Sequence, residues 1–104
     1  MIGLGFNIRM KTGFYETKLY NLQITKGELI LSPIESDDSV DKISEESILN
    51  ITLIEGEKAS GIEIQTNGRI YECLLTNKMD YELLLTLLKE NINKKIICEF
   101  EGGH

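Results

Sequence analysis

The segment at residues 77–92 constrains the fold of this chain most, because it is the one strongly helical stretch among 104 residues. At about 100° per residue, its apolar side chains gather on one arc that is wider than a surface helix needs. The members of this arc are Tyr81, Leu84, Leu85, Leu87, Leu88 and Ile92, with Leu83 at its edge. An arc of this width predicts a helix covered by a curved sheet or a barrel mouth, with Leu84 and Leu88 deeply buried. A helix that binds a partner or dimerises would need part of this arc to stay exposed.

The start of this segment carries capping signals. The side-chain oxygen of Asn77 is placed to accept a free backbone N–H, as an N-cap residue does. Asp80 follows at the position of a capping box, and its charge suits the positive end of a helix. We therefore expect the helix to begin directly after Asn77.

Short stretches in which apolar and polar residues alternate fill the chain before the helix, and this period of two is typical of half-buried β-strands. The predicted strands span residues 4–11, 19–25, 28–34, 43–54, 62–65 and 69–75. Lys26-Gly27 and Asn67-Gly68 predict tight turns, the first because Gly supplies positive φ and the second because both residues tolerate it. A seventh strand would come from a division of residues 43–54 or from the apolar run near residues 96–100, which could equally extend the helix. The inward faces predicted for these strands include Ile8, Leu22, Leu49, Ile64 and Cys73.

The net charge of −6 is concentrated in one segment, residues 35–46, which holds six acids and one base. Such a run predicts a solvated loop. Its aspartates Asp37, Asp38 and Asp41 are candidate contacts for a basic protein partner. An EF-hand loop counted from Asp37 would need Gly and an acid where Lys42 and Ile48 stand, so we expect no metal site. An acidic chain is also a poor candidate for nucleic-acid binding, because the phosphates require clustered lysine and arginine side chains.

Catalytic signals are missing from the sequence. The only histidine, His104, is the last residue and belongs to a tail at 102–104 of the kind that a purification tag leaves. Without a histidine in the body of the chain, neither a Ser-His nor a Cys-His pair can form. We therefore expect no enzyme activity and no cofactor. Cys73 and Cys98 lie in apolar surroundings and are predicted to be small buried side chains without a disulfide. No signal peptide or membrane-length apolar run is visible, so the cytoplasm is the expected compartment.

Two stretches resemble a known superfamily. Residues 22–31 (LQITKGELIL) resemble the hairpin that leads into the third strand of pleckstrin-homology-like (PH-like) domains. Residues 43–48 (ISEESI) resemble the entry into the fourth strand of the GRAM-type and bacterial members. The Asn67-Gly68 hairpin and the Leu-rich helix complete a resemblance that covers most of the chain. The resemblance implies a single domain at residues 1–101. It also implies a mainly β fold, in which a bent antiparallel barrel of six to seven strands is capped by a C-terminal helix.

The resemblance also implies binding functions, because PH-like domains bind phosphoinositides, peptides or other proteins. Lipid-binding members carry basic residues at the end of the first strand and in the second strand. Lys11 and Lys18 match two of these positions, and Arg9 lies nearby, but Tyr20 stands where the last arginine belongs.

Three functional hypotheses follow. The leading one is a non-enzymatic binding or scaffolding module for a protein or peptide, which would contact the aspartates of the acidic loop or add a strand beside residues 28–34. The second is recognition of an anionic lipid headgroup or membrane surface through Arg9, Lys11 and Lys18. The third is a self-assembling structural domain that forms homo-oligomers.

Overall fold

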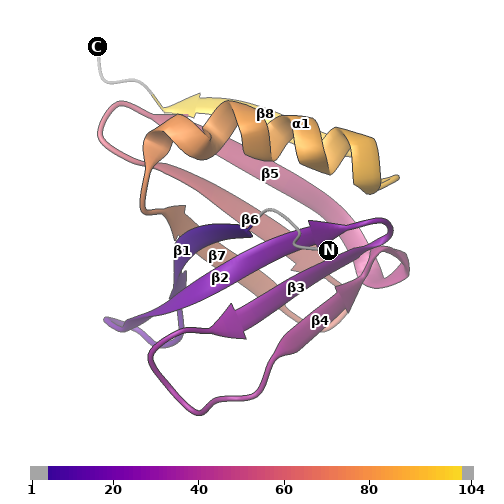
Figure 1. Cartoon of the computed structure of the whole chain (residues 1–104). Helices are drawn as coiled ribbons and strands as arrows, with labels where there is room; N and C mark the ends of the chain where they lie inside the picture. Colours follow the sequence, from indigo (N-terminus) through magenta and orange to yellow (C-terminus); the bar gives the residue numbers. More distant parts are fainter. Residues whose placement is uncertain (1–4, 102–104) are drawn as a thin grey trace.

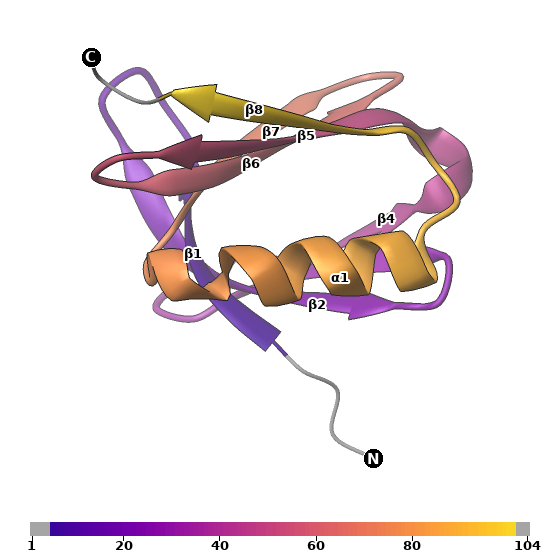
Figure 2. The same cartoon turned by 90° about the horizontal axis from the view of Figure 1, so that it is seen from above.

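The computed structural model describes residues 5–101, apart from the side chain of Lys78, so the predictions about Leu4 and the tail at 102–104 lie outside it. Eight strands form one strongly bent sheet, and a single α-helix lies along its open side (Figures 1 and 2). The strands are β1 (Gly5–Lys11), β2 (Thr17–Thr25), β3 (Glu28–Pro33), β4 (Asp41–Ser44), β5 (Ile48–Gly56), β6 (Ser60–Thr66), β7 (Ile70–Leu75) and β8 (Ile96–Glu101). The helix is α1 (Tyr81–Asn91), and two 3-10 turns are η1 (Glu45–Ser47) and η2 (Lys78–Asp80).

The sheet has more strands than the six to seven expected, and within residues 5–101 it does not close into a barrel. Its order is β4-β3-β2-β1-β7-β6-β5-β8. Both predicted sources of an additional strand are realised, because η1 divides residues 43–54 and the run after the helix forms β8. β8 pairs with β5 in parallel, whereas the other neighbours are antiparallel. The strand at residues 28–34 is wrongly predicted as an edge, since β3 pairs with both β2 and β4.

The concave face of the sheet and one face of α1 enclose the hydrophobic core. Strand β1 shows the pattern best, because Phe6, Ile8 and Met10 are buried and the residues between them are exposed. From the helix, Tyr81, Leu84 and Leu88 are buried, which confirms the predicted burial of the two leucines. Within the described residues no helix has the length and apolar character needed to cross a membrane.

Leu49 is the exception among the described residues predicted to face inward. Ile8, Leu22, Ile64 and Cys73 are buried as expected, but Leu49 is 52% exposed. The cause is a bulge in β5, where the pairing with β6 moves from Ile48↔Thr66 to Asn50↔Gln65 and leaves Leu49 as the additional residue. One inserted residue moves the following side chains to the opposite face, and simple alternation cannot foresee it.

The helix is anchored at both ends by contacts that differ from the predicted capping box. The Asn77 side chain accepts a hydrogen bond from the Met79 N–H at 3.0 Å, so it caps η2 rather than α1. Asp80 makes no side-chain cap bond. At the other end, the Gly27 N–H donates to the Asn91 carbonyl at 2.9 Å, which ties the last turn of α1 to the β2–β3 turn.

The two predicted tight turns form, but only one uses positive φ. Gly27 has a φ of 79°. In the β6–β7 hairpin neither Asn67 nor Gly68 has positive φ. There, the Thr66 hydroxyl donates to the Arg69 carbonyl at 2.8 Å and accepts from the Arg69 N–H, so a side chain closes the turn.

Truncation of a helix leucine should reveal how much the fold depends on α1. We expect Leu88→Ala to lower the free energy of unfolding by roughly 2–5 kcal/mol, because it leaves a cavity in a fully buried site. Leu83→Ala is the matched control on the same helix, since Leu83 is 43% exposed. Urea denaturation of the two variants measures the difference, and equal effects would contradict this description of the core.

Candidate functional site

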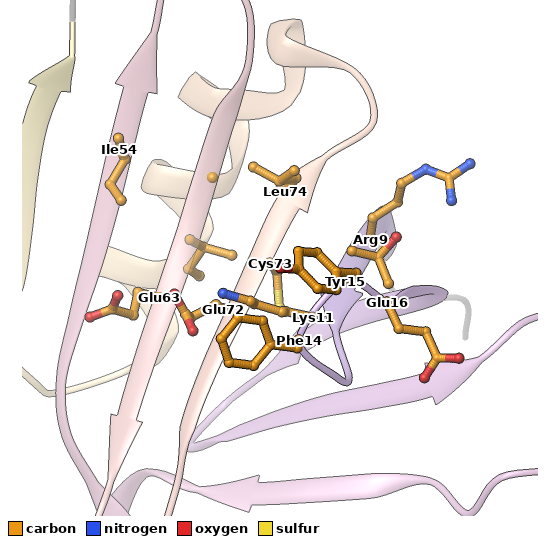
Figure 3. Close-up of a pocket in the computed structure, with 13 residues that line it drawn as sticks. Arg9, Lys11, Phe14, Tyr15, Glu16, Ile54, Glu63, Glu72, Cys73 and Leu74 are labelled. Carbon is orange, nitrogen blue, oxygen red and sulfur yellow. The ribbon is translucent and has the colours of Figure 1, made fainter.

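A pocket of about 390 Å³ lies on the outer face of the sheet, next to the β1–β2 loop (Figure 3). We call it the outer pocket. Strands β7, β6 and β5 form its wall, and the loop and the end of β1 form its rim. The residues that matter for its chemistry are Lys11, Phe14, Tyr15, Ile54, Gly61, Glu63, Glu72 and Leu74.

A missing side chain creates the floor of the outer pocket. Leu74, Gly61 and Ile54 lie in one row across β7, β6 and β5, so the glycine separates two aliphatic side chains. A Cβ at Gly61 would lie 2.7 Å from the Cys73 carbonyl oxygen, so close strand packing requires glycine here. The row therefore forms an apolar depression between Leu74 and Ile54.

Two adjacent aromatic residues stand at the rim. Phe14 is 86% exposed and Tyr15 is 97% exposed, and their ring centroids lie 5.2 Å apart. The loop that carries them is closed by the Thr12 and Gly13 N–H groups, which donate to the Glu16 carbonyl at 2.9 Å and 3.3 Å. Two exposed rings beside an apolar depression are the kind of surface that marks binding sites.

Two carboxylates oppose each other beside this depression. Glu63 on β6 pairs directly with Glu72 on β7, and like charges at opposed positions destabilise a sheet. The side chain of Lys11 extends from β1 toward Glu72 (Figure 3). No basic side chain described by the structure lies within 4.0 Å of either carboxylate. The wall of the outer pocket thus carries two carboxylates, and the cationic side chains of Arg9 and Lys11 also line the pocket.

The cations of the lipid hypothesis do not all come together. Arg9 and Lys11 lie on the outer face of β1, whereas Lys18 is opposite the buried Met10 and so belongs to the other face. Arg9 and Lys18 line a smaller hollow of about 180 Å³, which Lys11 does not reach. Tyr20, where the lipid motif has its last arginine, is buried, and burial raises the pKa of its phenol.

Lys18 is also neutralised by a residue from the other predicted site. Its Nζ donates to the Asp38 Oδ2 at 3.0 Å, and this hydrogen bond raises the pKa of Lys18 and lowers the pKa of Asp38. The Ser36 hydroxyl donates to the same carboxylate oxygen. Lys18 from the predicted lipid site and Asp38 from the predicted protein-binding site thus form an ion pair with each other.

The acidic loop offers fewer free carboxylates than the sequence suggests. The predicted loop at residues 35–46 is shorter than expected, because Asp41 begins β4 and η1 follows that strand. Asp41 lies 3.8 Å from the Arg69 Nη1, and the guanidinium in turn sits over the Tyr71 ring at 4.3 Å from its centroid. Asp37 is exposed, and no ion pair or hydrogen bond of its side chain is present among the described residues. Across residues 5–101, no group of three acids, cysteines or histidines is arranged to hold a metal ion.

The cysteines have different environments, which corrects the prediction that both are buried. Cys73 is buried, but Cys98 is exposed because β8 lies at the edge of the sheet. Both thiols are free. Burial raises the pKa of the Cys73 thiol to about 12.

Comparisons with known proteins support the fold. No family model matches the chain, and no curated protein does. Among solved structures, the chain is similar to one described as "Structure of the Spt16D Pob3N heterodimer", with a TM-score of 0.67 and 13% sequence identity. The match covers 100% of this chain but only 57% of that one. The chain therefore has a PH-like fold, as its sequence resemblance implied.

Sequence reasoning missed the outer pocket. Its residues come from two distant parts of the chain, and only the pairing of β1 with β7 brings them together. One local signal was available, because Phe14-Tyr15 places two large aromatic residues in a glycine-containing turn. Aromatic residues in a solvated turn bury nothing locally and so indicate a contact surface.

Removal of one opposed charge should stabilise the protein. We expect Glu63→Gln to raise the free energy of unfolding by roughly 0.2–1 kcal/mol at low salt, because it relieves the repulsion from Glu72. The gain should shrink at high salt. Glu57→Gln in the β5–β6 turn is the control and should have almost no effect. Denaturation at two ionic strengths tests this, and a loss of stability in Glu63→Gln would contradict the assigned repulsion.

The two thiols should react at very different rates. In the folded protein at neutral pH, a thiol reagent should label Cys98 rapidly and Cys73 only after unfolding, because the buried thiol is protonated and covered. Mass spectrometry of the labelled protein counts the modified sites. In Cys98→Ser the rapid phase should disappear, and its persistence would show that Cys73 is accessible.

Proposed function

We propose that this chain is a non-enzymatic protein-interaction module that holds a peptide segment of its partner in the outer pocket. This proposal rests on three features that occur together in the outer pocket. They are two exposed aromatic rings, an apolar depression, and the opposed carboxylates of Glu63 and Glu72, which form no ion pair among the described residues. The solved heterodimer to which the chain is similar is compatible with a binding role for this fold.

The chemistry of the outer pocket defines the peptide it fits. The depression between Leu74 and Ile54 suits one aliphatic or aromatic side chain, which Phe14 and Tyr15 would cover. A lysine or arginine next to it would lie between Glu63 and Glu72 and form charge-assisted hydrogen bonds. The repulsion between these carboxylates would be relieved on binding, so the acids contribute to affinity while they weaken the free domain.

We also propose that the chain is a GRAM-type or bacterial member of the PH-like superfamily that works in the cytoplasm. The support is the sequence resemblance at residues 22–31 and 43–48. In the structure these stretches form the β2–β3 hairpin and the segment from β4 through η1 into β5.

Selection from a random peptide library against the immobilised protein tests the proposed function. We expect the selected peptides to carry a basic residue beside a large apolar one. A synthetic peptide of this kind should bind the Phe14→Ala/Tyr15→Ala variant roughly tenfold or more weakly, because buried aromatic anchors dominate such interfaces. Met79→Ala removes another exposed apolar side chain, away from the pocket, and should bind like the unchanged protein.

The opposed carboxylates provide a second, independent measurement. Glu63→Gln, which is expected to stabilise the fold, should weaken binding of the same peptide, so lost affinity cannot be ascribed to unfolding. If Asp37→Asn or Asp38→Asn abolished binding instead, the acidic loop would be the site and this proposal would be wrong. Salt-sensitive sedimentation with anionic vesicles, lost in Lys11→Glu, would likewise overturn it in favour of lipid recognition.

A further inference from the structure

The strand β8 is an edge of the sheet with an open side. It pairs with β5 alone, and in Figure 1 no described element lies beyond it. The opposite edge, β4, is only four residues long and is partly engaged, since Asp41 pairs with Arg69. A longer edge with an apolar composition is a template for strand addition.

The direction of the backbone groups on β8 follows from its pairing with β5. The Ile51 N–H donates to the Lys95 carbonyl at 3.1 Å, and Ile51 pairs with Ile96 in the parallel register. In a parallel pair, alternate residues direct both backbone groups to the neighbouring strand. Lys95, Ile97 and Glu99 therefore point their backbone groups to β5. The groups of Ile96, Cys98 and Phe100 point to the open edge.

The sequence of this edge is complementary to itself in the antiparallel direction. About a two-fold axis at Ile97, Lys95 of one copy is opposite Glu99 of the other, and Ile96 is opposite Cys98. Lys95 and Glu99 are exposed, and neither forms an ion pair among the described residues. Ile96 and Cys98 would form the hydrogen-bonded pairs, because their backbone groups point outward. Ile97 would be opposite itself in a non-hydrogen-bonded pair, where side chains are closest.

We propose that β8 is a homodimerisation edge, on which a second copy of this chain pairs antiparallel about Ile97. The occupant is a second copy because its own Lys95 and Glu99 supply the two opposite charges at matching positions, as a closed two-fold interface requires. The sheet then continues from one copy into the other. A short strand pair buries little surface, so the dimer is weak and forms at high protein concentration. This inference is independent of the outer pocket.

A charge reversal tests the pairing. Lys95→Glu and Glu99→Lys each place like charges opposite one another twice across the axis. Each should weaken dimerisation by roughly tenfold, measured by sedimentation equilibrium over a wide concentration range. The double variant Lys95→Glu/Glu99→Lys restores both attractions and should dimerise like the unchanged protein. A strict monomer at all concentrations, or a double variant no better than the single ones, overturns the proposal.

A cysteine at the axis tests the register. In a Cys98→Ser background, Ile97→Cys places two thiols at a non-hydrogen-bonded pair, where Cβ atoms about 4.5–5.5 Å apart approach disulfide geometry. Mild oxidation should convert most of this variant to a covalent dimer on a non-reducing gel. Ser44→Cys in the same background places an exposed thiol on the β4 edge and should stay monomeric. Equal cross-linking of the two variants would show random collision and would refute the register.

Discussion

The burial of Leu84 and Leu88 against the concave face of the sheet is the contact on which this structure depends. A strongly bent sheet that does not close has a core exposed along its open side, and α1 covers that side. Both leucines are fully buried, and the helix is held at its end by the Gly27 N–H, which donates to the Asn91 carbonyl. Because the apolar face of α1 is used in this way, it is not available as a partner-binding surface.

The same arrangement explains why the candidate sites lie on the outside of the sheet. In each strand, residues that alternate with core positions face outward, so the core fixes their order across neighbouring strands. This order aligns Leu74, Gly61 and Ile54 in one row and sets Glu63 against Glu72. The outer pocket is thus a consequence of the register that the core requires. Its aromatic rim is added by a loop that carries no core residue.

The sequence was sufficient to predict those strands and the helix whose hydrophobic pattern lies within one short stretch of chain. Alternation predicted β1, β2, β3 and β7, and the leucine spacing predicted α1 and its buried face. Sequence reasoning was wrong where a single inserted residue, or a pairing between distant strands, determines which face a side chain occupies. The bulge in β5 turns the side chain of Leu49 outward. Cys98 is exposed because its strand, β8, pairs with β5 at the edge of the sheet. The three predicted lipid cations do not meet at one place, because Arg9 and Lys18 share a hollow that Lys11 does not reach, and Lys18 is bound by the side chain of Asp38. None of these contacts has a signature within a short window of sequence.

The glycine at the floor of the outer pocket has a consequence for the kinetics of recognition. Its depression exists because strand packing excludes a side chain at Gly61, so the backbone itself keeps this part of the pocket open. For the proposed peptide, association should therefore be governed by diffusion, and differences in affinity among peptides should appear mainly as differences in residence time. Evolution could then alter the preferred ligand by exchanging two exposed loop residues, without any change to the sheet that supports them.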